Sequence, residues 1–151
     1  MTMPGLMTYT CRVEIAAPRA RVLELMTDGD RAAEWMPGLV SYRAIEGERG
    51  TPGSVSELRF DGVPGPGEMI EKVERRDAEH HDVVYLLGPV RNVVHNTFVE
   101  LPDGGTRWAA EHIFHLPPGM LEGIGEQGQA AFRQNTQGSM ETFKTWCEAN
   151  A

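Results

Sequence analysis

The sequence has little cysteine, a deficit of basic residues and no long apolar run. Among its 151 residues there are two cysteines, Cys11 and Cys147, which are too few for a disulfide framework and are not spaced as metal ligands. We interpret both as core thiols and expect a reducing, cytoplasmic location. We expect no metal and no other cofactor.

The balance of charge argues against one class of partner. The sequence has 14 Lys and Arg residues against 22 Asp and Glu, a formal net charge of −8. No cluster of Lys or Arg could neutralise a run of phosphates, so nucleic acid is not expected as a partner. The first residues, MTMPGLMTYT, lack the pattern of a signal peptide, and no segment approaches the roughly 18 apolar residues of a membrane span.

Common catalytic motifs are also missing. The sequence contains no nucleophile elbow, phosphate-binding loop, GxGxxG turn or metal triad. His80 and His81 fall between two predicted strands, and we interpret them as solvated turn residues. Candidate chemistry must therefore be sought among individual polar side chains that point inward.

The secondary-structure pattern begins with short elements separated by turns. Ten prolines and seventeen glycines are distributed between them, and the length of 151 residues predicts a single domain, 1–151. Period-two alternation predicts strands at about 8–15, 39–46, 54–60, 68–76, 82–87, 91–101 and 105–115. Two short helices are predicted between the first two strands, one opened by Ala17-Pro18 and one capped by the DGD at 28–30. Because strands in unbroken succession need no crossover helices, they predict an antiparallel sheet.

One long amphipathic helix is predicted over 121–148. Its inner arc, about 120° wide, holds Leu121, Ile124, Gly128, Ala131, Phe132, Asn135, Ser139, Thr142, Phe143 and Trp146. Small and polar residues occupy positions in this arc where a core helix would carry Leu or Ile. Either Gly128 and Gly138 allow another backbone to cross closely, or the helix borders open space.

These segments resemble a known family. The stretch IAAPRARVLELMTDGDRAAEWMPGL resembles the N-terminal motif of the SRPBCC superfamily, the START/Bet v 1-like helix-grip proteins, and the order of elements agrees over residues 8–150. GPVRNVVHNTF, GGTRW, F-x-L-P-P-G and NTQGSMETFK are similar to its polyketide cyclase/dehydrase branch. The resemblance implies an α+β fold in which a curved antiparallel sheet of about seven strands wraps around the C-terminal helix.

The helix-grip resemblance also implies a cavity between helix and sheet. Its expected occupant is a hydrophobic small molecule that is polyketide-like, aromatic or lipid-like. The loop at 61–68 and the turn at Gly88-Pro89 would border its mouth, whereas Phe143 and Trp146 would close the far end as core. We predict as ligand-binding residues Trp35, Tyr42, Trp108, Gly128, Phe132, Asn135 and Ser139.

Two functions follow from this resemblance, a cyclase or dehydratase and a non-catalytic carrier of a hydrophobic metabolite. A third class, a protein-binding module akin to chaperone activators, would need an exposed apolar patch that the sequence does not display. The strand after the 61–68 loop begins Gly67-Glu68-Met69-Ile70 and lacks the Arg that aromatase/cyclases carry. The protein is expected to be a monomer or a homodimer.

The candidate acid and base groups are His95, His112 and Tyr85. The turn in LPDGGT predicts that Leu101 pairs with Thr106, which would place His95 opposite His112 on the inward face, about 5 Å apart at Cβ. Neighbouring imidazoles could shuttle a proton. The alternative is that they only orient a ligand or fill the sheet face.

Overall fold

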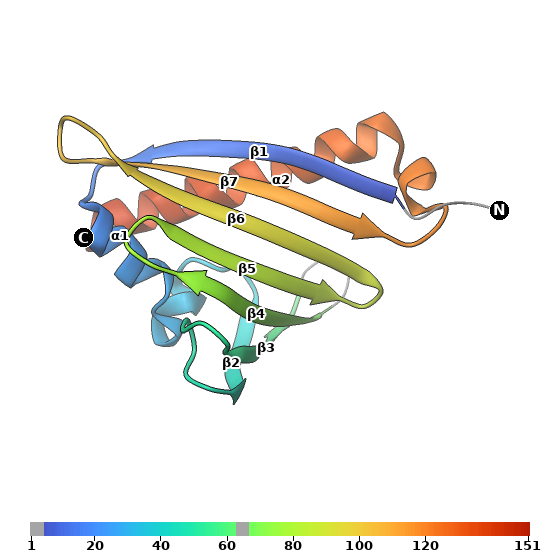
Figure 1. The fold of residues 1–151 in the computed structure, drawn as a ribbon, viewed down its shortest axis with the longest axis horizontal. Coiled ribbons are helices and arrows are strands. Elements are labelled where there is room, and N and C mark those ends of the chain that lie inside the picture. Colours follow the sequence, from blue (N-terminus) through green and yellow to red (C-terminus); the bar gives the residue numbers. More distant parts are fainter. Residues whose placement is uncertain (1–4, 63–66) are drawn as a thin grey trace.

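A single antiparallel sheet and one long helix dominate the computed structural model, which describes residues 5–62 and 67–151 (Figure 1). The strands are β1 (Gly5–Ile15), β2 (Leu39–Glu46), β3 (Val55–Phe60), β4 (Glu68–Arg76), β5 (His80–Leu87), β6 (Val90–Glu100) and β7 (Thr106–Leu116). The helices are α1 (Arg19–Met26), the 3-10 helix η1 (Gly29–Glu34) and α2 (Met120–Asn150). The seven strands are ordered β1-β7-β6-β5-β4-β3-β2. The predicted α+β architecture is confirmed, whereas half of the predicted rim loop at 61–68, residues 63–66, lies outside the described residues.

Helix α2 covers the free edge of the sheet at β1. Three of its side chains donate hydrogen bonds to β1 carbonyl oxygens: Arg133 to Thr10 at 3.3 Å, Gln137 to Arg12 at 3.0 Å and Lys144 to Glu14 at 2.6 Å. These alternate carbonyls point away from β7, so α2 satisfies acceptors that an edge strand would leave unpaired. One flank of α2 is thereby fixed against β1.

The C-terminal part of α2 closes one end of the molecule with aromatic packing. Phe143 is fully buried, and its ring meets Trp35 and Trp108 edge-on at centroid distances of 4.8 and 5.5 Å. Trp146 is half-buried beside Phe143, as predicted for this end. Cys11 and Cys147 are both buried free thiols, which confirms their interpretation as core residues.

The first two thirds of α2 contributes no fully buried side chain, although Leu121 and Ile124 pack against the core. The buried residues of the helix are Met140, Phe143 and Cys147, all toward the C-terminus. The predicted inner arc is partly wrong, because it includes Phe143 but omits Met140 and Cys147, whereas Asn135 and Ser139 are exposed. The physical reason is that the buried stripe of the regular helix after Gly125 runs through Met140, Phe143 and Cys147, and Asn135 and Ser139 lie to one side of it. Before this segment the helix is kinked at Gly125, whose φ of 66° and ψ of −178° are not helical, so the residues on the two sides of the kink do not share one arc.

The predicted register of β6 against β7 is wrong by one residue. Glu100 pairs with Thr106, which leaves Leu101 to Gly105 in the loop. Gly104 donates to Leu101 O at 3.0 Å and has a φ of 87°, so it adds a third loop residue after the Pro102-Asp103 turn. As a result His112 pairs with Val94, and His95 points to the opposite face of the sheet.

Candidate functional site

A buried carboxylate lies on the inner face of the sheet, the face toward α2. Glu71 of β4 is 4% exposed and accepts a hydrogen bond from the Tyr42 hydroxyl of β2. Tyr85 of β5 lies directly opposite Glu71 in the β4–β5 register. Arg49 holds Tyr42 in place, since it stacks on the ring at 5.4 Å and donates to the Tyr42 carbonyl oxygen at 3.1 Å.

This Tyr42–Glu71–Tyr85 cluster has shifted acidities. Burial raises the pKa of Glu71, and the Tyr42 hydrogen bond lowers it only in part. Burial and the Glu71 charge raise the pKa of Tyr42 and of Tyr85 well above the ordinary range. None of the ion pairs among the described residues includes Glu71. The cluster therefore holds one titratable acid beside two hydroxyls that keep their protons at neutral pH.

A polar row extends from this cluster across the inner face. In register order it runs through Ser56, Glu71, Tyr85 and Asn92 on four adjacent strands. Ser56 Oγ and Asn92 Oδ1 are buried without a hydrogen-bond partner in the described structure. Unpaired buried polar atoms are costly, and here they lie on both sides of Glu71 and Tyr85. We interpret the row as a binding site in which water or a ligand completes their hydrogen bonds.

His112 lies next to this row. Its Nδ1 is 3.1 Å from Asn92 Nδ2. Burial lowers the pKa of His112 to about 4, so the ring is neutral at pH 7. The Tyr9 ring stacks beside His112 at 5.2 Å, and the Tyr9 hydroxyl shares a 2.7 Å hydrogen bond with Thr136 of α2.

The other histidines do not join this site. His95, predicted to face His112, lies instead on the outer face, where its Nδ1 is 3.4 Å from Asp82 Oδ1. His81, interpreted as a solvated turn residue, begins the inward alternation of β5 and is 6% exposed. Burial lowers the pKa of His81 to about 4. Both predictions of orientation are wrong.

The predicted aromatic ligand-binding residues separate into two groups. Trp108 is packed between Phe98 and Phe143 and donates to Asn96 Oδ1 at 2.8 Å, so the structure places it in the core. Trp35 also packs on Phe143, at the closed end. Tyr42 lies in the Glu71 cluster. Phe132 is 38% exposed and meets Phe114 at 5.4 Å, so it joins α2 to the sheet near the polar row.

The predicted ligand-binding residues of α2 lie on its less packed flank. Asn135 and Ser139 are exposed and project on the side of the helix away from Gln137, which binds β1. A Cβ at Gly128 would come within 2.4 Å of the Ile124 side chain, so the helix is tightly packed on itself there. Contact of these three residues with a ligand stays a prediction.

Glu71 and Asn92 were missed by the sequence reasoning. Glu71 stands between Met69 and Val73 in the alternation of β4, and a charged residue in that inward phase was the available signal. Asn92 has the same phase as Val94 and Phe98, but that phase is recognisable only with the correct β6–β7 register.

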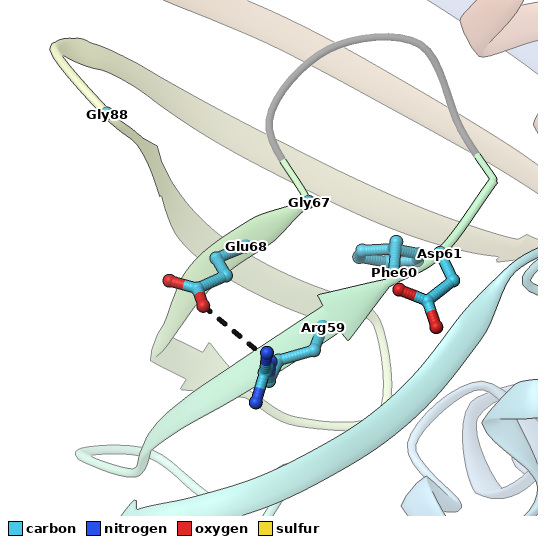
Figure 2. Close-up of a pocket in the computed structure, with 6 residues that line it drawn as sticks. All are labelled: Arg59, Phe60, Asp61, Gly67, Glu68 and Gly88. Atoms are coloured by element: carbon cyan, nitrogen blue, oxygen red, sulfur yellow. Dashed lines mark ion pairs between the residues drawn. The ribbon is translucent and has the colours of Figure 1, made fainter.

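A separate open pocket lies at the ends of β3 and β4. Figure 2 shows its lining residues, Arg59, Phe60, Asp61, Gly67, Glu68 and Gly88. Its charged lining residues are Arg59, Asp61 and Glu68, of which Arg59 and Glu68 pair with each other at 3.6 Å. These charges are open to solvent, whereas the unpartnered atoms of the Glu71 row are buried.

Over residues 5–62 and 67–151, no group of three or more His, Cys, Asp or Glu side chains is placed to hold a metal ion. Within the same ranges, none of the helices has the length and apolar character needed to cross a membrane.

Comparison with known proteins agrees with this architecture. Residues 7–148 match the family model described as polyketide cyclase/dehydrase and lipid transport. Ara h 8.0201 is similar in structure, with a TM-score of 0.77 at 18% identity over 96% of this chain and 99% of that chain. No curated protein sequence matches this chain significantly.

Two structures of biosynthetic proteins are also similar. A Thalictrum norcoclaurine synthase point mutant, in complex with a transition-state analogue, gives a TM-score of 0.74 at 13% identity over 99% of both chains. The di-domain ARO/CYC protein StfQ of the steffimycin biosynthetic pathway gives 0.74 at 14% identity over 96% of this chain and 51% of that chain. At these identities the likeness shows the fold alone.

Proposed function

This chain belongs to the polyketide cyclase/dehydrase and lipid transport family, in agreement with the resemblance of its motifs, and we propose that it binds a hydrophobic, carbonyl-bearing small molecule between α2 and the sheet and promotes its cyclisation or dehydration. The observation that carries this proposal is the buried Tyr42–Glu71–Tyr85 cluster on the inner face. A buried acid without a cationic partner is costly for stability, and such groups concentrate where proton transfer is needed.

The apolar part of the ligand would lie along aromatic side chains near the polar row. Tyr9, Phe114 and Phe132 form a continuous surface from β1 and β7 to α2, with centroid distances of 5.9 Å for Tyr9–Phe114 and 5.4 Å for Phe114–Phe132. The partly exposed Phe132 is open to contact on one side. Flat or elongated molecules bury well against such rings.

Glu71 would act as the general base and then as the general acid. Its carboxylate removes a proton from the carbon next to a carbonyl group, and the enolate carbon bonds to a second carbonyl carbon of the same molecule. The new alkoxide oxygen takes the proton back from Glu71. In dehydration, Glu71 removes the adjacent carbon-bound proton and the hydroxyl leaves with that proton as water. Burial raises the pKa of Glu71 toward neutral pH, and a group with such a pKa both accepts and returns a proton efficiently.

The two tyrosines would stabilise the negative oxygen that forms in these steps. While Glu71 is ionised, Tyr42 donates to it. Once Glu71 has taken up a proton, the hydroxyls of Tyr42 and Tyr85 are released to donate to the enolate or alkoxide oxygen. Because their pKa values are raised, they remain donors throughout the neutral range.

The test uses a naphthyl β-hydroxyketone whose retro-aldol cleavage releases a fluorescent naphthaldehyde, the reverse of the proposed bond formation. Glu71→Gln should lower kcat by about 100-fold or more, the usual contribution of a general base. The matched control is Glu74→Gln, because Glu74 is an exposed carboxylate on the same strand. Equal rates for the two variants would contradict the assignment of Glu71.

The same probe separates an enzyme from a carrier. Displacement of 1-anilinonaphthalene-8-sulfonate by the β-hydroxyketone reports binding alone. Displacement with no cleavage above the uncatalysed rate by the unmodified protein would favour the carrier function, in which the Glu71 cluster only anchors the ligand. Absence of both displacement and cleavage would contradict the proposed ligand class.

A further inference from the structure

His112 is held in a fixed orientation by neighbouring rings. Its ring lies nearly parallel to Tyr9, at 17°, and to Phe114, at 16°, and the three centroids are 5.2 to 5.9 Å apart. Tyr9 is itself tied to α2 through Thr136. Rotation of the imidazole would disturb this packing, so its two nitrogens keep distinct surroundings.

Asn92 determines which nitrogen carries the proton. Its amide nitrogen, Nδ2, donates to His112 Nδ1 at 3.1 Å, and Asn92 is 6% exposed. An amide nitrogen can only donate, so with this orientation of the Asn92 amide Nδ1 is the accepting nitrogen of the ring. In the neutral imidazole the single proton is then on Nε2.

The Nε2 edge of His112 is available to a ligand. Among residues 5–62 and 67–151, none accepts a hydrogen bond from it, and Nε2 does not occur among the buried polar atoms that lack a partner. The side chain is only partly buried. A polar group of a bound molecule could therefore reach this N–H.

We propose that Asn92 is a positioning residue that keeps the His112 proton on Nε2, so that His112 donates a hydrogen bond to a carbonyl oxygen of the ligand and does not act as a base. This inference rests on the proposed function for the identity of the ligand. It assigns opposite roles to the two sides of the site, since Glu71 accepts protons and His112 donates a hydrogen bond.

The spacing of the two groups defines the class of ligand further. Glu71 on β4 and His112 on β7 are separated by three strand spacings, about 14 Å between backbones. One carbonyl group cannot contact both side chains when they are this far apart at the backbone, so a ligand that contacts both needs a second oxygen function. The site therefore fits an elongated molecule with at least two carbonyl groups, one bound at His112 and one undergoing reaction at Glu71.

The direct test is the protonation pattern of His112 in a long-range ¹H–¹⁵N correlation spectrum at pH 7, assigned with His112→Gln. The unmodified protein should show a protonated Nε2 and an unprotonated Nδ1. In Asn92→Asp the carboxylate can only accept, so Nδ1 should become protonated. Asn96→Asp is the matched control, because Asn96 lies on the same face of β6 but bonds Trp108 and the His81 carbonyl oxygen.

Two results would overturn the role of Asn92. One is a protonated Nδ1 in the unmodified protein, a measurement that depends on no variant. The other is an Asn92→Asp variant that is folded by circular dichroism and still has an unprotonated Nδ1.

Binding of 2-acetylnaphthalene and 2-ethylnaphthalene tests the carbonyl contact. The dissociation constant of 2-acetylnaphthalene divided by that of 2-ethylnaphthalene should be about fivefold larger in Asn92→Asp than in the unmodified protein. This is the change expected for loss of one net hydrogen bond of about 1 kcal/mol. Comparison of ratios removes the difference in hydrophobicity between the compounds. An unchanged ratio would contradict the donor role of His112. Failure of both compounds to bind the unmodified protein would contradict the proposed function, while the spectrum would still decide the role of Asn92.

Discussion

Acidification from pH 7 to pH 5 should reduce the free energy of unfolding through His112, which burial keeps neutral in the folded protein. On folding, the pKa of His112 falls from 6.5 to about 4. Between these values the unfolded chain binds a proton that the folded protein does not, so stability is fully present above about pH 6.5 and is lost as the pH falls toward 4. At about 1.36 kcal/mol per pKa unit, the loss is about 3 kcal/mol in full and about 2 kcal/mol between pH 7 and pH 5.

Urea denaturation at the two pH values measures this loss. His81 and the carboxylates also contribute to acid destabilisation, so the comparison is made between variants. His112→Gln keeps an acceptor for Asn92 and should lose about 2 kcal/mol less than the unmodified protein. His115→Gln, an exposed change on the same strand, should lose as much as the unmodified protein. An equal loss in His112→Gln and the unmodified protein would refute the burial of a neutral His112.

Three further predictions concern α2. Phe143→Ala should lower the free energy of unfolding by about 3 to 5 kcal/mol in urea denaturation, because it empties a fully buried site between two indole rings. Gly125→Ala should lower the free energy of unfolding by about 1 to 3 kcal/mol, since the backbone conformation of Gly125 suits glycine alone. Gly138→Ala should raise it by up to about 1 kcal/mol, because a Cβ there meets only open space. The reverse order of stabilities would argue against the kink at Gly125. Ser139→Leu should weaken binding of 1-anilinonaphthalene-8-sulfonate without changing stability, and unchanged binding would exclude this flank of α2 from the site.

The positions of the strands could be predicted from the sequence because alternation and turn residues are local signals. The predicted strand at 39–46 coincides with β2, and the predicted strand at 68–76 coincides with β4. The two short helices after β1 follow equally local signals, Pro18 before α1 and Asp28 as the cap of η1. Their order along the chain was sufficient for the fold.

The register of β6 on β7 needed information that the sequence does not state. Whether LPDGG forms a loop of even or odd length depends on the backbone conformation of Gly104, and a single added residue reverses the face of every side chain in one strand. Because the register was wrong by one residue, the inward orientation of Asn92 and the outward orientation of His95 could not be predicted. Glu71 depended on no such choice, because β4 was predicted with the correct bounds, and its inward phase could have been recognised.

The central claim is that the ligand lies between α2 and the inner face of β4 to β7. The most direct measurement is a ¹H–¹⁵N amide titration of the protein with 2-acetylnaphthalene. The largest changes in amide chemical shift should occur at Glu71, Asn92, His112 and the α2 residues around Phe132. Changes confined to the outer face around His95, or to the pocket at Arg59 and Glu68, would contradict this placement.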